Sequence, residues 1–120
     1  MANLIIKTEI QPSALKAFSK NEVVLFIEVF NPTSQILWGE SEINVNSPLS
    51  LSFDSELNKG KMRVGILEPN QKKQKKLNIY TKQNNYPDDY KINMIFFVYD
   101  TDGAIFERID QQVILPCKEQ

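Results

Sequence analysis

Residues 22–31 read EVVLFIEVFN, and this stretch decides the fold. Aliphatic side chains recur in it at every second position, at Val23, Leu25, Ile27 and Val29. Alternate residues of a β-strand point to the same face of a sheet, whereas a helical face needs apolar residues three or four positions apart. The stretch is therefore predicted to be a strand that turns this aliphatic stripe toward a core.

Further alternating runs lie on both sides of this strand, and turn residues separate them. Residues 31–34 (NPTS) close the strand, and residues 100–103 (DTDG) are typical of a tight hairpin turn, because Gly103 tolerates a positive φ. No long window has the apolar period of a helix. The other predicted strands cover residues 4–10, 36–47, 61–67, 75–81, 89–100 and 104–115, with a short extra strand at 49–53.

This succession of strands and turns predicts the class of fold. Seven main strands and one short extra strand are typical of a sandwich of two sheets. We therefore predict an all-β fold, an immunoglobulin-like antiparallel β-sandwich of seven to eight strands, in a single domain spanning residues 1–120. A chain of this length can bury enough surface to fold without a disulfide or a metal ion.

Two aromatic residues stand where such sandwiches often have them. Tyr90 follows a Pro-Asp-Asp corner, so it is predicted to form a tyrosine corner whose hydroxyl bonds to nearby backbone. It also begins a second core stripe, through residues 92, 94, 96 and 98. Trp38 resembles the core tryptophan. The apolar phase changes between Trp38 and Ile43, so a bulge is expected near Gly39, and the direction of the Trp38 side chain stays open.

The composition argues against catalysis. The chain has no His and one Cys, so the commonest general base and zinc ligand is missing, and a Ser-His-Asp or Cys-His arrangement is impossible. Cys117 cannot form an internal disulfide and is interpreted as an incidental surface thiol in a frayed tail. We expect a protein that is not an enzyme and that needs no cofactor and no metal ion.

Two charged segments could bind ligands, and each has a simpler interpretation. Asp100 and Asp102 resemble the start of an EF-hand, but Ala104 and Gln111 stand where that loop needs oxygen ligands, so a hairpin turn is preferred. Residues 72–76 read KKQKK, and such a run can bind phosphate or anionic lipid. More often it is a solvated part of a strand, or it guards a sheet edge against aggregation.

Charge and the amino-terminal sequence bear on location and partners. The net charge is −1 at pH 7, so no whole-protein field attracts nucleic acid or an anionic membrane, and no nucleic-acid partner is expected. The apolar run at residues 4–6 is too short for a signal peptide or a membrane span. With a single cysteine, the prediction is a cytoplasmic location, or an extracellular one if a signal peptide has been removed.

Several predicted strands are also apolar on the face opposite the core stripe. The strand at 22–31 carries two phenylalanines there, and the strand at 89–100 carries a phenylalanine and a tyrosine. Loops or lysine stems could cover these rings, a bulge could change their phase, or they could bind a protein partner or a second copy. Because aromatic anchors dominate many interfaces, the candidate partner-binding residues are Phe26, Phe30, Phe97 and Tyr99.

Three segments resemble parts of CARDB-like domains, which are adhesion-type immunoglobulin-like modules common in archaeal and bacterial proteins. Residues 28–31 (EVFN) resemble the end of their apolar-x-apolar-x-Asn strand. Residues 64–69 (VGILEP) resemble their Gly-x-Leu-x-Pro step, and residues 87–92 (PDDYKI) resemble their Pro-Gly-x-Tyr corner. The resemblance implies a binding or spacer module.

A second resemblance is to the Rho guanine-nucleotide dissociation inhibitor sandwich. It rests on residues 62–65 (MRVG), Pro69, residues 90–92 (YKI) and the hairpin at 100–102 (DTD), which follow in a similar order. That family holds a lipid tail between its sheets, so this resemblance implies an apolar ligand. Adaptor ear domains are a third sandwich type of similar size.

The leading prediction is a non-enzymatic interaction or scaffolding module that binds a partner through a sheet surface. Two alternatives stay open. One is a carrier of an apolar or lipid ligand, and the other is an adaptor ear-like peptide-binding domain. A carrier predicts an internal cavity lined by Ile27, Val29, Met94 and Phe96, whereas an interaction module predicts a closed core with apolar outer faces.

Overall fold

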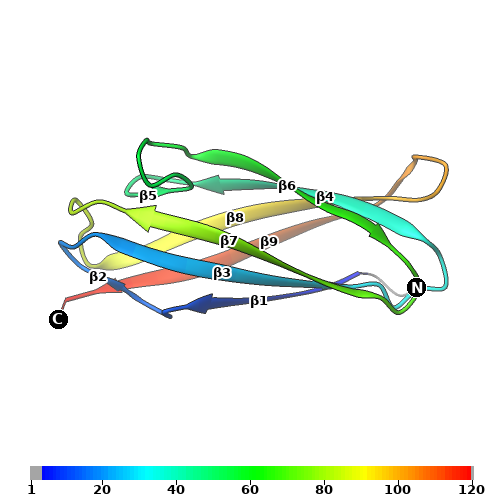
Figure 1. The fold of residues 1–120 in the computed structure, drawn as a ribbon, viewed down its shortest axis with the longest axis horizontal. Coiled ribbons are helices and arrows are strands. Elements are labelled where there is room, and N and C mark those ends of the chain that lie inside the picture. Colours follow the sequence, from blue (N-terminus) through cyan, green and yellow to red (C-terminus); the bar gives the residue numbers. More distant parts are fainter. Residues whose placement is uncertain (1–3, 120) are drawn as a thin grey trace.

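The structure is a computed structural model that describes residues 4–119 as two β-sheets packed face to face (Figure 1). These residues contain strands and turns but no helix, which confirms the predicted all-β class. In chain order, the strands are β1 (Ile5–Gln11), β2 (Leu15–Lys16), β3 (Asn21–Phe30), β4 (Leu37–Val45), β5 (Leu49–Ser50), β6 (Lys59–Leu67), β7 (Lys72–Thr81), β8 (Asp88–Tyr99) and β9 (Ile105–Lys118).

The strands form one sheet of four and one sheet of five. The order in the four-stranded sheet is β1-β3-β7-β5, and in the five-stranded sheet it is β2-β9-β8-β4-β6. Neighbouring strands run antiparallel, except that β2 is parallel to β9. The predicted immunoglobulin-like antiparallel sandwich is therefore confirmed, and β2 is an addition that the sequence pattern did not indicate.

The core lies between the sheets and follows the predicted alternation. The aliphatic stripe of β3, from Val23 to Val29, is at most 1% exposed, and so are Ile92, Met94, Phe96 and Val98 of β8. Burying one such side chain stabilises the fold by roughly 1.5–3 kcal/mol relative to leaving it in water. The predicted tyrosine corner is also present, because the Tyr90 hydroxyl donates a hydrogen bond to the backbone carbonyl of Tyr86 at 2.6 Å.

The structure corrects the expected place of Trp38. Every second residue of β4 from Leu37 to Val45 is buried without a change of phase, so Trp38 points outward and is not a core tryptophan. The extra residue lies on β6, because Gly39 pairs with Gly65 and the next residue of β4 pairs with Arg63. Gly65 takes a φ of 88° there, which residues with a side chain rarely adopt. The bulge expected near Gly39 is therefore present, but on the partner strand.

The end of the chain also departs from the prediction. β9 does not stop before Pro116 but continues to Lys118, because its last two residues pair with Leu15 and Lys16 of β2. Cys117 is only 4% exposed, so the expected surface thiol in a frayed tail is wrong. A pairing of two residues leaves no alternation in the sequence, which is why both β2 and the burial of Cys117 were missed.

The remaining boundaries lie close to the prediction. The hairpin turn at 100–103 is confirmed, with the backbone N–H of Gly103 3.1 Å from the carbonyl of Asp100 and a φ of 81° at Gly103. The short strand expected at 49–53 is reduced to β5. β7 begins at Lys72 rather than at residue 75, so the whole lysine run belongs to a strand.

One buried polar side chain holds two turns together at the end of β3. The Asn31 amide donates to the backbone carbonyls of Gln35 at 2.8 Å and of Leu67 at 3.1 Å. Its carbonyl accepts from the backbone N–H of Thr33 at 3.0 Å. Because buried polar groups need partners, Asn31 fixes the turn after β3 against the turn after β6.

The sandwich is elongated, with principal extents of 48 × 23 × 18 Å. β8 and β9 run along its length, β1 begins at one end, and β9 finishes at the other (Figure 1). Among residues 4–119 there is no helix long and apolar enough to cross a membrane.

Candidate functional site

The four aromatic residues predicted as a contact surface lie on opposite faces of the sandwich. Phe26 and Phe30 belong to β3 and point outward from the four-stranded sheet. Phe97 and Tyr99 belong to β8 and point outward from the five-stranded sheet. The core separates the two pairs, so they cannot bind one partner as a single surface.

Lysine side chains cover the aromatic pair on the four-stranded sheet. The ammonium group of Lys76 lies 5.7 Å from the ring centre of Phe26, and that of Lys72 lies 5.9 Å from the ring centre of Phe30. A lysine stem can pack along an aromatic face while its charge stays in water. The sequence analysis considered that lysine stems cover the outward aromatic rings. Phe26 and Phe30 are covered in this way.

On the five-stranded sheet, four aligned side chains form what we call the apolar row: Ile66, Trp38, Tyr99 and Ile105. The register pairs Trp38 of β4 with Ile66 of β6 on one side and with Tyr99 of β8 on the other. Tyr99 in turn pairs with Ile105 of β9. Partners in register point to the same face of a sheet, so the apolar row crosses four strands side by side.

The ends of the apolar row are open to solvent, while its middle is packed. Ile66 is 61% exposed and Ile105 is 68% exposed. The rings of Trp38 and Tyr99 stack between them, with centroids 4.6 Å apart and planes 23° from parallel. Stacked aromatic rings restrain one another, so this part of the surface is formed before any partner arrives.

Charged side chains border the apolar row along the strands. The Tyr99 hydroxyl donates to the carboxylate of Glu40 at 3.3 Å. Burial raises the pKa of the Tyr99 phenol above its ordinary value of 10.0, and the neighbouring Glu40 carboxylate raises it further. Phe97, the next outward residue of β8, has the guanidinium of Arg108 at 5.9 Å from its ring centre.

Sequence reasoning found Tyr99 and Phe97 but missed both ends of the apolar row. Ile66 adjoins the bulge at Gly65, and its outward direction follows only when one extra residue is allowed at that glycine. Ile105 adjoins a second irregularity, where the register shifts between residues 98 and 99 of β8. An alternation count that permits one inserted residue at a glycine would have found the first of these.

The core has no space at the place where a carrier would hold its ligand. Ile27, Val29, Met94 and Phe96 are each at most 1% exposed, so these side chains pack against other protein atoms and border no water-sized space. Sites for drug-sized ligands usually occupy roughly 300–1,000 Å³. The cavity predicted by the carrier alternative is therefore not seen between the sheets formed by residues 4–119.

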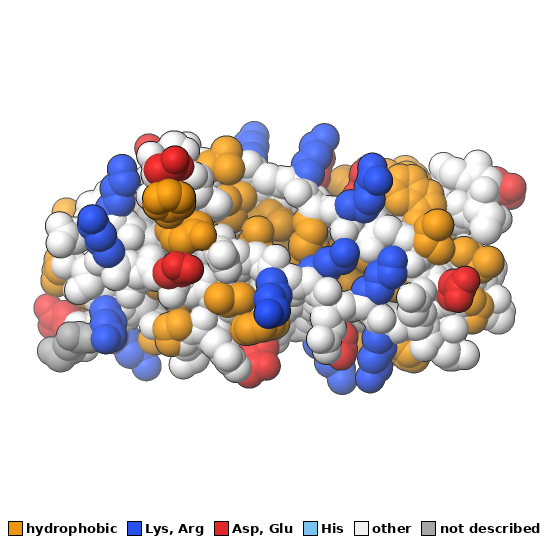
Figure 2. Space-filling view, in the orientation of Figure 1, with side chains coloured by type: hydrophobic (Ala, Val, Ile, Leu, Met, Phe, Trp, Pro, Cys, Tyr) orange, Lys and Arg blue, Asp and Glu red, His pale blue; other side chains and the backbone are white. Residues whose placement is uncertain are grey.

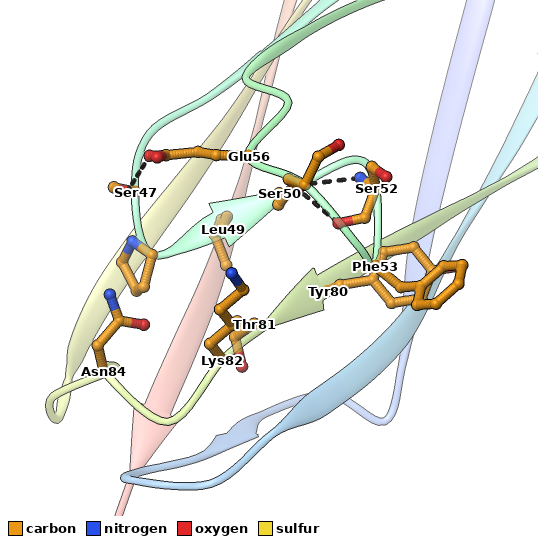
Figure 3. A pocket seen from close by; sticks show the side chains of 12 residues that line it. Ser47, Leu49, Ser50, Ser52, Phe53, Glu56, Tyr80, Thr81, Lys82 and Asn84 are labelled. Carbon is orange, nitrogen blue, oxygen red and sulfur yellow. Dashed lines mark hydrogen bonds between the residues drawn. The ribbon is translucent and has the colours of Figure 1, made fainter.

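A small surface pocket lies beside β5 and the loop that follows it (Figure 3). Its volume is about 150 Å³, which is small for an organic ligand. Figure 3 shows Phe53 beside Tyr80 at its rim, and the Ser47 hydroxyl donating to the Glu56 carboxylate at 2.6 Å. The Ser50 hydroxyl likewise bonds to the backbone of the same loop. These polar groups serve the loop itself, so we assign no ligand to this pocket.

Solved structures share this architecture. A putative ApaA protein from Bordetella pertussis aligns with a TM-score of 0.64 and 13% identity, over 96% of this chain and 94% of that chain. A FixG-related protein from Vibrio parahaemolyticus aligns with a TM-score of 0.57 and 12% identity, over 98% and 99%. At such low identity these likenesses show the sandwich fold alone.

The remaining comparisons do not identify a family for this chain. The ASH / PapD-like domain 7 of human CEP192 aligns with 14% identity over 95% of this chain and 87% of that one, but its TM-score of 0.46 is too low to support an argument. No family model matches the chain, and no curated protein matches it in sequence. The CARDB-like and Rho inhibitor resemblances are therefore not confirmed beyond the sandwich fold that they imply.

Proposed function

We infer that this protein is a non-enzymatic interaction module that binds a protein partner through the apolar row. The observation that carries the proposal is the exposure of Ile66 and Ile105 on either side of the stacked Trp38–Tyr99 pair. Covering apolar surface is favourable by about 25 cal/mol for each Å² removed from water. Contact with another protein that removes this continuous apolar strip from water is therefore favourable in free energy.

The surroundings of the apolar row define the partner's chemistry. Trp and Tyr are the residue types that most often dominate binding energy, and they occupy the middle of the strip. Glu40 and Arg108 offer a carboxylate and a guanidinium at its border. The partner that fits has apolar side chains at the centre of its contact and hydrogen-bonding groups at the rim.

The opposite face supports a contact less well. A partner that docked on Phe26 and Phe30 would first have to displace the lysine side chains that cover both rings. Displacing each ammonium gives up a cation–π contact worth about 0.5–1 kcal/mol, and burying the ammonium without a partner costs more. Of the four residues predicted from the sequence, we keep Tyr99, because it belongs to the apolar row, and Phe97, because it lies next to that row on the same face. Arg108 lies over the Phe97 ring, so Phe97 belongs to the border of this surface. Phe26 and Phe30 lie on the opposite face and are not part of it.

A first experiment uses Trp38, the only tryptophan of the chain, as a reporter. Light scattering and tryptophan emission are measured together over a concentration series. Self-association through the apolar row predicts a rising mass together with a blue shift, because the indole leaves water. A dimer without a blue shift would place the self-contact elsewhere and contradict this site.

If the protein stays monomeric, peptides selected from a random library on the immobilised protein serve as the probe. Selected peptides should blue-shift Trp38 and lose affinity at least about tenfold for the double variant Ile66→Ser/Ile105→Ser. Both positions are exposed, so the variant should still fold. Ile5→Ser is the matched control, because Ile5 is 45% exposed on the opposite face. Equal binding by the row variant and the control overturns the proposal.

A further inference from the structure

A second surface lies on β7, which has a free edge for most of its length. On one side, β7 pairs with β3 from Lys72 to Thr81. On its other side, β5 pairs only with the last two residues, Tyr80 and Thr81. Within residues 4–119, positions 72–79 thus keep unpaired backbone groups, and an exposed strand edge can pair with an extended chain.

This edge and its neighbour β6 carry an unbalanced positive charge. Half of the 14 Lys and Arg residues of the chain lie on the two strands, and neither strand contains an Asp or a Glu. The only ion pair among the described residues joins Arg108 to Asp110 on β9. Figure 2 shows Lys and Arg side chains over the region where Figure 1 places β6 and β7. We call this set the basic edge: Lys59, Lys61, Arg63, Lys72, Lys73, Lys75 and Lys76.

Two lysines of the basic edge point inward rather than to solvent. Lys73 and Lys75 are in register with Val29 and Ile27, both core residues of β3, and both lysines are half-buried. The Lys73 ammonium donates to the backbone carbonyl of Val64 at 3.4 Å, across the space between β7 and β6. It lies 3.0 Å from where a Cβ on Gly65 would stand, so that glycine leaves it room.

Inward lysines select the kind of strand that can join the edge. An added strand with apolar side chains would remove Lys73 and Lys75 from water without giving their charges a partner, which is costly. An added strand with carboxylates would pair with them. Because alternate residues of a strand share a face, the matching segment carries acidic residues two positions apart.

We propose that the basic edge binds an acidic extended segment of a partner protein, which adds to β7 as a strand and places alternate carboxylates on Lys73 and Lys75. This surface is separate from the apolar row, so it provides a second contact. A nucleic acid fits less well, because phosphate oxygens accept from the N–H groups of a strand edge but cannot donate to its carbonyl groups, whereas an extended peptide does both.

The test uses labelled peptides and fluorescence anisotropy at low salt. The probe alternates Glu with Thr and is long enough to cover residues 72–79; a Lys-for-Glu peptide is its control. The proposal expects the Glu peptide alone to bind, and Lys73→Gln/Lys75→Gln to weaken it at least about tenfold. The control variant Lys16→Gln/Lys20→Gln also removes two positive charges, but away from β7, and should change the Kd by less than about twofold. Equal loss in both variants overturns the proposal.

A second measurement separates strand addition from simple charge attraction and needs no protein variant. Two further Glu peptides carry backbone N-methyl groups on alternate residues, one on the odd set and one on the even set. Strand addition presents only one set to β7, so one peptide should bind and the other should not. Equal binding of the two, or binding of an oligonucleotide or an anionic vesicle in place of the Glu peptide, contradicts the proposal.

Discussion

Asn85 donates a hydrogen bond from its side-chain amide to the sulfur of Cys117, across an Nδ2–Sγ distance of 3.6 Å. Both residues are buried. Burial raises the pKa of the Cys117 thiol above its ordinary value of 9.0, and the bond from Asn85 offsets part of that rise. As the pH rises, the unfolded chain therefore loses this proton before the folded chain does, which favours unfolding. The stabilising contribution is full below about pH 9 and is lost as the pH rises through the folded pKa.

We expect the free energy of unfolding to fall as the pH rises above 9.0, the ordinary pKa of the thiol, and Cys117→Ala to remove the earlier part of that decline. Urea midpoints across this range measure it. The pKa of Tyr90 is also raised, first by burial and then by Cys117, from an ordinary value of 10.0, so it adds a later decline. Tyr90→Phe is therefore the control that keeps the earlier part. An identical pH profile for wild type and Cys117→Ala would contradict the buried thiol.

Tyr90→Phe also tests the tyrosine corner at neutral pH. The substitution keeps the ring but removes the hydroxyl that bonds to the Tyr86 carbonyl. We expect a loss of about 1 kcal/mol in the free energy of unfolding, the usual net value of one hydrogen bond. Tyr80→Phe is the matched control, because within residues 4–119 the Tyr80 hydroxyl makes no hydrogen bond. Equal urea midpoints for the two variants would mean that the corner does not stabilise the fold.

Phe96 and Phe97 are adjacent on β8 but face opposite sides of the sheet. Phe96 is 1% exposed in the core, so Phe96→Ser should cost at least about 4 kcal/mol through the cavity and the buried hydroxyl. Phe97→Ser changes an outward residue and should cost about 1 kcal/mol while weakening association through the neighbouring apolar row. Thermal denaturation of both variants decides this. Global unfolding of Phe97→Ser would place Phe97 in the core and remove it from the candidate surface.

Asn31→Ala should destabilise the protein strongly. It leaves the buried carbonyl of Leu67 and the N–H of Thr33 without the partner seen here, and we expect a cost of about 3 kcal/mol. Asn93→Ala is the control, because Asn93 is exposed and accepts a hydrogen bond from Gln112 on the surface. That change should stay within about 0.5 kcal/mol. Similar chemical denaturation curves for the two variants would show that Asn31 does not hold the turns together.

The parts of the fold that could be predicted are those where one local pattern has one structural meaning. The alternation from Val23 to Val29 and the corner at Tyr90 each specify a strand and its inward face. Gly103 specifies a turn because few other residues take its φ. These features need no knowledge of which strand lies next to which.

The parts that could not be predicted depend on pairing between distant strands. The direction of Trp38 could not be read from the sequence, because an outward tryptophan between apolar neighbours has the same pattern as an inward one. Phe26 and Phe97 were grouped because both strands are apolar on two faces, and only the sheet order shows that they belong to different sheets. The burial of Cys117 depends on β2, which is too short to leave a signal.

The directions of β1 and β9 decide how the sandwich responds to tension. β1 starts at one end of the long axis and runs inward beside β3, while β9 leaves at the other end beside β8 (Figure 1). A force that pulls these two ends apart draws each strand along its own axis, so the hydrogen bonds of each ladder carry the load together instead of opening one after another. Rupture then requires a whole ladder to slide at once. Under such a load, the lifetime of the fold is set by its rate of unfolding rather than by its equilibrium stability.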